Sequence, residues 1–227
     1  MDNMYNMYNK IPYVLVFRGE SFRFNNKKGD RRTINDPTEQ INALKSVKKN
    51  VVDHWSHKYK LDHVIASTYS TKFDNLLKEK LSEIFNVKII FVTSSKSHST
   101  QITTIKNSFK YINISAFIIR FDAMLNVPFP MEKLNKVLFA AWHYTGKPQC
   151  ADPLIWIPKN YLEKCKIVIR ERWYSHYMAI MLKKQQVDCD VFFNIRIRTD
   201  QKKGMHKDET IRDKRKRPWI LVSRGYS

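Results

Sequence analysis

The chain has 227 residues, of which 43% are hydrophobic and 13% aromatic, and its formal net charge is +20 at pH 7. This apolar content excludes wholesale disorder, and the length suits a single substantial core. No apolar run approaches the roughly 20 residues that cross a bilayer, and the N-terminal "MDNMYNMYNK" lacks the apolar core of a signal peptide. We therefore expect a folded protein with no transmembrane segment, preceded by a short flexible lead-in.

The positive charge favours polyanionic partners, such as nucleic acid, an anionic membrane or a diphosphate. The chain is also rich in Lys, Asn, Ile and Tyr, which AT-rich codons specify, so base composition is a second explanation of the charge. A dense share of it lies in "QKKGMHKDETIRDKRKRP" (201–218), which has almost no apolar residues and is typical of a mobile loop or tail. The charge alone therefore does not identify a ligand.

Three cysteines, Cys150, Cys165 and Cys189, are widely spaced and odd in number. They form neither a disulfide framework nor a zinc-binding set, because no pair has the close C-x₂₋₄-C spacing. We expect free thiols in the core or on the surface, and a reducing compartment.

Along the first half, apolar runs of strand length alternate with apolar residues at helical spacing. The expected elements are a strand over 13–17, a helix from Thr38 to Trp55, a strand over 62–70, a helix over 71–85, a strand over 87–94, a helix over 99–112 and a strand over 115–122. Thr38 is the expected N-cap of the first helix. This alternation predicts an α/β chain with a mostly parallel sheet covered on both faces.

Polar residues follow each of these strands, and in open α/β sheets ligands bind outside the carboxyl ends of the strands. We therefore expect one rim of the sheet to carry the strand-end pairs Arg18-Gly19, Ser67-Thr68, Thr93-Ser94 and Arg120-Asp122.

The second half is mixed. We expect a proline-broken loop and then a short helix within 126–144, a strand at "LIWIP" (154–158), a long helix over 167–185, an antiparallel strand over 190–199 and a short apolar run over 218–225. No internal repeat and no Gly/Ser linker divides the chain, so we expect one domain.

Several common motifs are missing, namely G-x-G-x-x-G, Walker A, C-x-x-C, H-E-x-x-H and G-x-S-x-G. With five glycines in all, the chain has little material for glycine-rich phosphate loops. These absences argue against a Rossmann dehydrogenase, a methyltransferase, a P-loop enzyme and a serine hydrolase.

The first candidate site is "FRGESFRF". A turn at Gly19 directly after a strand, flanked by Arg18 and Arg23, suits a diphosphate held by charge-assisted hydrogen bonds. The arginines at 31–32 add charge nearby. The alternative is an ordinary strand-to-loop turn with solvated arginines.

The second candidate is Arg120 and Asp122 in "FIIRFDAML". Many nucleotide-sugar enzymes place Asp-x-Asp at such a strand end, where a carboxylate binds Mn²⁺ or Mg²⁺ and the ion neutralises the leaving diphosphate. Here Arg120 occupies the first position. It either contacts the diphosphate or pairs with Asp122, and the whole segment is otherwise only the polar rim of a core.

The third candidate is Asp152 in "CADPLIWIP", which precedes an apolar strand. It is either a general base for an acceptor hydroxyl or a turn residue before Pro153.

Other chemistry-bearing side chains have a structural explanation as well as a functional one. The histidines are either metal ligands or bases, or structural and solvated residues, and they are His54, His57, His143, His176 and His206. The aromatic residues form either a sugar-stacking platform or part of the core, and they are Trp142, Trp156, Trp173 and Tyr174.

Taken in order, "VLVFRGESFRF", "EQINALKSV", "TYST", "FIIRFDAML" and "ADPLIWIPKNYL" resemble the small glycosyltransferases of large DNA viruses that infect algae and amoebae. The resemblance runs from about Tyr13 to Tyr161 and rests on the ordered set of segments. It implies a GT-A fold, in which a Rossmann-like nucleotide-binding half is fused to an acceptor-binding half.

The resemblance also implies an activity, the transfer of a sugar from a nucleotide diphosphate sugar to a hydroxyl of a glycan or glycoprotein, often one on a capsid. Arg18, Gly19 and Arg23 match the nucleotide-side loop, Asp122 matches the Asp near the metal and the diphosphate, and Asp152 falls at the acceptor side. Arg120 departs from the family's Asp-x-Asp, so the expected Mn²⁺ or Mg²⁺ is either held by Asp122 alone or replaced by the charge of Arg120.

On this basis we divide the chain into a lead-in (1–12), a GT-A-like domain (13–200, with a nucleotide-sugar half over 13–125 and an acceptor half over 126–200), and a basic loop and tail (201–227). The expected location is the cytoplasm, that of the host cell for a viral protein, or the virion. The rival hypotheses are a basic nucleic-acid-binding protein and a catalytically inactive structural member of the fold.

Overall fold

The computed structural model describes residues 10–19, 37–94, 101–144, 148–150, 154–171, 178–193, 196–200, 205–208 and 218–221. Near several gaps only the backbone is described, namely at 101–102, 142–144, 148–150, 170–171, 196–200, 205–208 and 220–221. The first half contains β1 (Ile11–Arg18), α1 (Thr38–Val47), a π-helical segment η2 (Lys48–Asp53), β2 (Tyr59–Tyr69), α2 (Asp74–Phe85), β3 (Lys88–Ser94), α3 (Gln101–Ser108), a 3₁₀ turn η4 (Phe109–Tyr111) and β4 (Ser115–Arg120). Every strand and helix predicted for this half is present.

The second half contains shorter elements. They are β5 (Ala123–Leu125), β6 (Val137–Phe139), β7 (Trp142–Tyr144), β8 (Pro148–Cys150), β9 (Leu154–Ile157), a 3₁₀ turn η5 (Lys159–Tyr161), α4 (Leu162–Glu171), α5 (Met178–Lys184), β10 (Cys189–Val191), β11 (Arg196–Asp200), β12 (Met205–Asp208) and β13 (Trp219–Leu221).

The central feature is a seven-stranded sheet with the order β10-β6-β9-β4-β1-β2-β3. β1 pairs in parallel with both β2 and β4, and β2 pairs in parallel with β3. Within this sheet β9 runs antiparallel to its neighbours β4 and β6. The predicted mostly parallel sheet is confirmed, and the carboxyl ends of the four strands of the first half lie at one edge.

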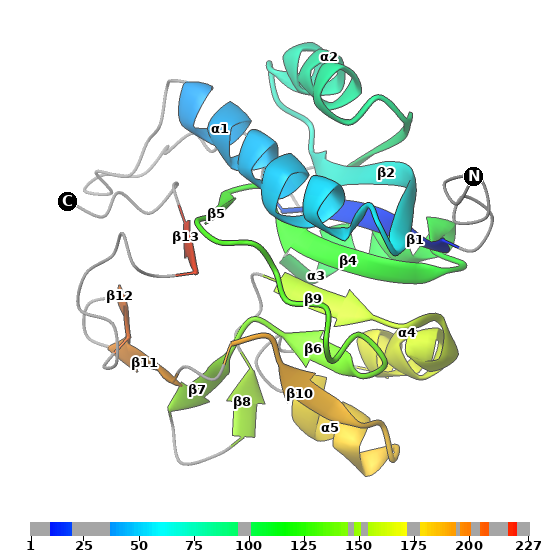
Figure 1. The fold of residues 1–227 in the computed structure, drawn as a ribbon, viewed down its shortest axis with the longest axis vertical. Coiled ribbons are helices and arrows are strands. Elements are labelled where there is room, and N and C mark those ends of the chain that lie inside the picture. Colours follow the sequence, from blue (N-terminus) through cyan, green and yellow to red (C-terminus); the bar gives the residue numbers. More distant parts are fainter. Residues whose placement is uncertain are drawn as a thin grey trace, which may run out of the picture.

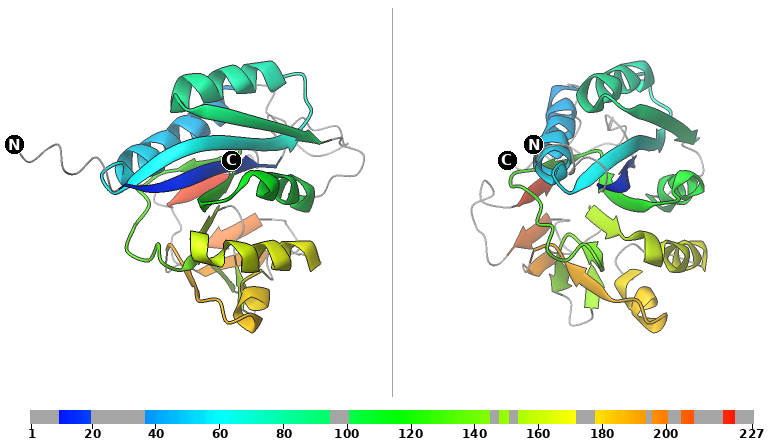
Figure 2. Two further views of the ribbon diagram at one scale, coloured as in Figure 1. Left: turned by 90° about the vertical axis from the view of Figure 1, so that its right-hand side faces the viewer. Right: turned by 45° about the vertical axis from the view of Figure 1, so that its right-hand side comes forward.

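Helices cover both faces of this sheet, as predicted. Side chains of α1 and α2 pack on one face and those of α3, α4 and α5 on the other, so the sheet separates two apolar clusters. Figure 2 shows this layering in its right-hand view. Strand alternation explains the division, since Leu15 and Phe17 of β1 face the first cluster while Val14 and Val16 face the second.

Two smaller sheets lie beyond the carboxyl edge of the large one, on the left of Figure 1. One has the order β12-β11-β7-β8, and the other pairs β13 with β5 in antiparallel register. β12 and β13 come from the basic region predicted as loop and tail, and both pair with strands from earlier in the chain.

Three expectations for the local structure are wrong. The short helix predicted within 126–144 is absent, because its apolar run forms β6, buried beside β9 and β10. A short apolar run has no periodicity that separates a buried strand from a buried helix. In place of the single strand predicted over 190–199 there are two, β10, which is parallel to β6, and β11, which lies in another sheet and has the expected antiparallel pairing with β12. The predicted N-cap Thr38 is the first helical residue, after Pro37.

The long helix predicted over 167–185 corresponds to α4 and α5, and residues 172–177 between them lie outside the described part. Within the described residues, no helix combines the length and the apolar character that a membrane crossing requires.

Trp55 lies at the centre of an aromatic cluster under α1 and η2. Its ring centroid is 5.6 Å from that of Tyr13 and 5.4 Å from those of Phe117 and Trp156. Its indole Nε1 donates to the carbonyl of Phe129 at 2.9 Å. Trp55 therefore joins η2, three strands and the segment after β5.

We expect Trp55→Ala to destabilise the protein by about 3–5 kcal/mol, because it removes a large buried ring and leaves the Phe129 carbonyl without its donor. Urea unfolding followed by fluorescence and circular dichroism measures this. Lys60→Ala on the exposed face of β2 is the control and should stay within about 0.5 kcal/mol of the wild type. Equal losses for the two variants would contradict the central role of Trp55.

Candidate functional site

The strand ends chosen from the sequence meet at one place. Arg18, the last residue of β1, is in register with Ser67 of β2 on one side and with Arg120 of β4 on the other. The amide of Gly19 donates to the carbonyl of Ser67 at 3.2 Å, and the amide of Phe121 donates to the carbonyl of Arg18 at 3.2 Å. The predicted common rim is therefore confirmed for these strands.

Gly19 turns the chain away from the sheet with a φ of +100°. A Cβ at this position would meet no heavy atom within 4 Å. Conformation rather than crowding therefore favours glycine here, since L-residues rarely adopt such a φ.

Arg120 and Asp122 form a two-pronged ion pair. Nε of Arg120 donates to Oδ1 of Asp122 at 2.8 Å, and Nη2 donates to Oδ2 at 2.6 Å. This fork geometry holds both groups in fixed orientations and makes charge-assisted bonds of the strong kind. Of the two sequence-based alternatives for Arg120, the structure therefore contains the pairing with Asp122.

These charged groups are buried. Arg18 is 1% exposed, Asp122 is 5% exposed and Arg120 is 6% exposed. Burying charge is costly unless it is paired, so the Arg120–Asp122 pair offsets part of the desolvation of both partners. Two guanidinium groups and one carboxylate are therefore gathered in a buried setting at this end of the sheet.

The turn that carries Asp122 is held in place by contacts of β5, the strand that directly follows it. The backbone of Leu125 is held on both sides. Its amide donates to Ser46 Oγ at 2.9 Å, and its carbonyl accepts from Asn50 Nδ2 at 2.8 Å. On its other side β5 pairs with β13, and Asn126 donates to the carbonyl of Pro218 at 2.9 Å. The apolar run "PWILVSRG" predicts a buried segment, but nothing in it predicts the pairing of β13 with β5.

The hydroxyl residues at the ends of β2 and β3 hold α3. Ser67 Oγ donates to the carbonyl of Thr104 at 2.6 Å, and Asn107 Nδ2 donates to Ser94 Oγ at 2.7 Å. These strand-end groups therefore anchor a helix beside the site, which assigns them a structural role.

Two predicted site residues, Arg23 and Asp152, lie outside the described residues, as do the arginines at 31–32. Their roles stay predictions. Leu154, the first residue of β9, pairs with Ile119 of β4, so β9 begins at the same sheet edge as the Arg120–Asp122 pair.

A divalent ion at Asp122 does not fit the arrangement of the described residues. Both carboxylate oxygens accept hydrogen bonds from Arg120, and no group of three His, Cys, Asp or Glu residues in the described part is placed to share an ion. Hard cations such as Mg²⁺ prefer several oxygen ligands with an open coordination sphere.

Of the histidines and tryptophans considered from the sequence, the side chains of His54, His57 and Trp156 are described. His57 Nδ1 lies 3.1 Å from the carbonyl of His54 on an exposed turn, and the two rings have no described third partner for an ion. Trp156 is 1% exposed and belongs to the aromatic core, so of the two alternatives considered for it, the core is the one observed. His176, Trp173 and Tyr174 lie outside the described residues, and of His143, His206 and Trp142 only the backbone is described.

The two cysteines whose side chains are described are free thiols. Burial raises the pKa of Cys165, and burial together with Asp188 raises the pKa of Cys189 to about 12. Both are therefore protonated at neutral pH, which does not suit a nucleophile.

A surface pocket of about 750 Å³ lies at the opposite edge of the sheet. Its lining includes Ile11 and Tyr59 at the starts of β1 and β2, and Ser115 at the start of β4. Of the described site residues, Arg18, Gly19, Arg120 and Asp122 do not line it.

No protein-family model matches the chain, and no curated protein matches its sequence. Among solved structures, the fold is similar to that of the nucleoside-diphosphate-sugar pyrophosphorylase from Vibrio cholerae RC9, with a TM-score of 0.54 and 9% sequence identity, over 82% of this chain and 92% of that chain.

Two other solved structures have lower scores. The inositol-1-phosphate CTP transferase from T. maritima has a TM-score of 0.47 and 10% identity, over 81% of this chain and 85% of that one. The CTP:phosphocholine cytidylyltransferase from Streptococcus pneumoniae has a TM-score of 0.47 and 12% identity, over 80% and 89%. At this level of identity the similarity to the Vibrio protein establishes the fold alone, and the chain has the GT-A-like Rossmann fold that the resemblance implied.

We expect Arg120 and Asp122 to be strongly coupled in stability. Asp122→Asn or Arg120→Met alone should cost about 3–5 kcal/mol, because each leaves a buried charge without its partner. The double variant should lose less than the sum of the two, with a coupling energy of about 1–3 kcal/mol. Denaturant unfolding of all four proteins measures this cycle, and additive losses would show that the pair contributes nothing as a unit.

Proposed function

We propose that this protein is a glycosyltransferase that takes a sugar from a nucleotide diphosphate sugar and transfers it to a hydroxyl of a glycan or glycoprotein. The observation that carries the proposal is the convergence of Arg18, Gly19, Arg120 and Asp122 at the carboxyl ends of β1 and β4. Open α/β sheets bind their ligands at this edge.

The GT-A-like fold supports the proposal at a coarser level. The similar Vibrio protein is named for nucleoside-diphosphate sugars, so the proposed ligand class agrees with what that fold holds elsewhere. Segments within 13–161 resemble viral glycosyltransferases, and this resemblance supports sugar transfer as the reaction. It also supports a glycan on a capsid protein as the acceptor, and the cytoplasm of an infected cell as the place of the reaction.

The charge balance of the site suits a diphosphate. Arg18 lies in register with Arg120, and two guanidinium groups at neighbouring strand ends suit an anion. Fixed guanidinium groups in a buried setting stabilise negative charge that develops on a leaving group. In this chain Arg18 and Arg120 therefore take the neutralising role, and Asp122 orients Arg120.

The reaction consists of one displacement in the inverting case. The acceptor hydroxyl oxygen forms a bond to the anomeric carbon of the donor sugar while the bond from that carbon to the diphosphate oxygen breaks. The hydroxyl proton passes to a general base, for which Asp152 is the predicted residue. The products are the glycosylated acceptor and a nucleoside diphosphate. A retaining enzyme would carry the same binding residues.

A second candidate is nucleotidyl transfer, because the similar Vibrio protein is named a pyrophosphorylase. In that reaction the phosphate of a sugar 1-phosphate attacks the α-phosphorus of a nucleoside triphosphate and pyrophosphate leaves. The two activities are distinguished by their products, a nucleoside diphosphate in glycosyl transfer and pyrophosphate in nucleotidyl transfer.

We expect at least one donor from a panel of UDP-, GDP- and dTDP-sugars to raise the melting temperature of the full chain. A ligand at about 100 times its dissociation constant adds about 2.7 kcal/mol, which is a rise of roughly 5–10 °C for a chain of this size. Arg18→Met should abolish the rise, and Lys60→Met, an exposed substitution on β2, should keep it.

Product analysis then decides between the two reactions. Release of a nucleoside diphosphate from a stabilising donor supports the proposal, and release of pyrophosphate from a nucleoside triphosphate and a sugar 1-phosphate supports the second candidate. Stabilisation by nucleic acid alone, with a steep dependence on salt, would support the rival binding protein. Stabilisation by no donor would contradict the proposal.

We also expect donor binding to be independent of divalent ions. Both oxygens of Asp122 accept hydrogen bonds from Arg120, and the charge of Arg120 takes the place of the ion. The thermal shift given by a donor should be the same with Mn²⁺ as with EDTA. A shift that appears only with Mn²⁺ would contradict this and would place an ion in the site.

A further inference from the structure

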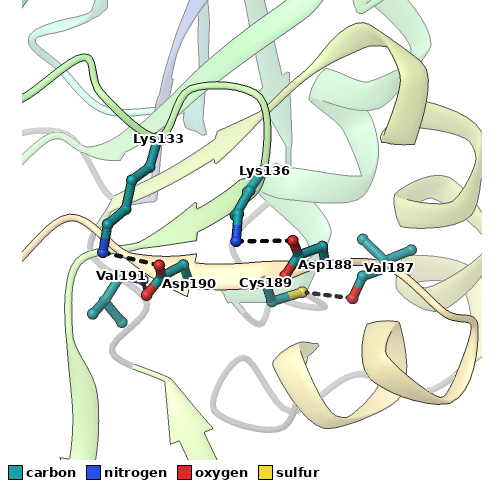
Figure 3. Close-up of polar contacts among 7 residues, drawn as sticks. All are labelled: Lys133, Lys136, Val187, Asp188, Cys189, Asp190 and Val191. Atoms are coloured by element: carbon teal, nitrogen blue, oxygen red, sulfur yellow. Dashed lines mark hydrogen bonds and ion pairs between the residues drawn. The ribbon is translucent and has the colours of Figure 1, made fainter.

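The two edges of the seven-stranded sheet differ in how they are protected. β10 is a short edge strand, and Asp190 within it and Asp188 directly before it face a neighbouring loop. Lys136 lies 2.9 Å from Asp188 and Lys133 lies 2.9 Å from Asp190, as Figure 3 shows. Burial acts to raise the pKa of Asp190, but the hydrogen bonds from Lys133 and the Val191 amide outweigh it and hold that pKa below its usual range. Short length and charge are the means by which edge strands avoid pairing with other chains.

β3 at the other edge has neither protection. It has seven residues, "KIIFVTS", and its only charged residue is Lys88 at the start. Among the described strands β2 is its single neighbour. Its apolar residues Ile89, Ile90, Phe91 and Val92 are half-buried, whereas the central residues of β1 and β4 are 0–1% exposed. A long apolar edge of this kind is a template for another strand.

The hydrogen-bond pattern shows which backbone groups of β3 face outward. The carbonyl of Ser94 accepts from the amide of Ser70, just beyond the end of β2, at 3.3 Å. Because backbone groups alternate sides along a strand, the amides and carbonyls of Ile89, Phe91 and Thr93 then point away from β2. They form an evenly spaced row that suits antiparallel pairing.

We propose that β3 pairs antiparallel with β3 of a second copy of this chain, about a two-fold axis at Phe91. In this register Phe91 lies opposite the partner's Phe91, and Ile89 lies opposite the partner's Thr93. The outward-facing residues then form the hydrogen-bonded pairs of an antiparallel ladder. The two copies present the same surface to each other, as a two-fold interface requires.

The sequence of β3 is complementary to itself in this register. Phe91 faces the partner's Phe91, and Ile90 faces the partner's Val92. Pairs of aromatic and of β-branched residues are favourable across antiparallel strands. Lys88 faces the partner's Ser94, so no two like charges oppose each other in the ladder. Lys78 of α2 lies 4.7 Å over the ring of Phe91 and covers its face, and no described strand pairs with the outer edge of β3.

The assembly ends at two copies. Once the β3 edges have paired, the outer edges of the joined sheet are the two β10 strands, which charge and short length protect. The proposed contact is therefore a dimer rather than a growing fibre. It is independent of the proposed enzyme activity, since the site lies at the carboxyl edge of β1 and β4.

Ser94 offers a matched pair of variants. Ser94→Lys places a lysine opposite the partner's Lys88 at both ends of the ladder, and Ser94→Glu places a glutamate there instead. Both lose the hydrogen bond from Asn107, so their effects on the monomer are comparable. With two charge pairs per dimer, we expect the dimer dissociation constant of Ser94→Lys to exceed that of Ser94→Glu by about tenfold or more.

Sedimentation equilibrium of the full chain over a range of concentrations gives these constants. A reversible wild-type dimer, with Ser94→Glu as tight or tighter and Ser94→Lys weaker, supports the proposal. A wild-type monomer at all concentrations, equal constants for the two variants, or assembly beyond a dimer would overturn it. Hydrogen exchange gives a second readout, since the amides of Ile89, Phe91 and Thr93 should become protected as the protein concentration rises.

Discussion

β1 runs between β2 and β4, and its parallel hydrogen bonds to both neighbours determine how the described strands and helices of the first half are arranged. Because the three strands share one direction, the chain must leave each of them at the same edge and return to the other edge through a helix. This one constraint places Arg18 beside Arg120 and covers both faces with helices. The two apolar clusters above and below the sheet then follow from the alternation of side chains along the same strands.

The first half of the fold could be predicted from the sequence because its signals are local and long. Runs such as "YVLVF" and "FIIR" are of strand length and contain β-branched residues, and they alternate with segments that carry full amphipathic helical turns. The shared rim followed from topology alone. The second half could not be predicted as well, because β6 and β10 have three residues each and are stabilised by partners far away in the sequence. No local pattern shows that "VLF" will lie beside "LIWI".

The candidate site shows the same limit at the level of side chains. The sequence places Arg120 and Asp122 together at a strand end. A spacing of two residues there does not decide whether the two side chains lie on the same face of the sheet or on opposite faces. Only the turn after β4 brings the carboxylate back onto the guanidinium. In the same way, the serine and threonine residues at the strand ends looked like ligand-facing groups, whereas Ser67 holds α3 through the carbonyl of Thr104.

The pairing of β13 with β5 has a consequence for biosynthesis. Trp219 is made long after Leu125, yet these two residues are partners in the short ribbon directly beyond Asp122. While the chain emerges from the ribosome, the large sheet can therefore close around β1 before this ribbon exists, since β1 to β4 are complete by Arg120. The turn that carries the buried ion pair gains its outer support only when residue 221 has left the exit tunnel. The geometry of the site is thus completed at a late step of folding.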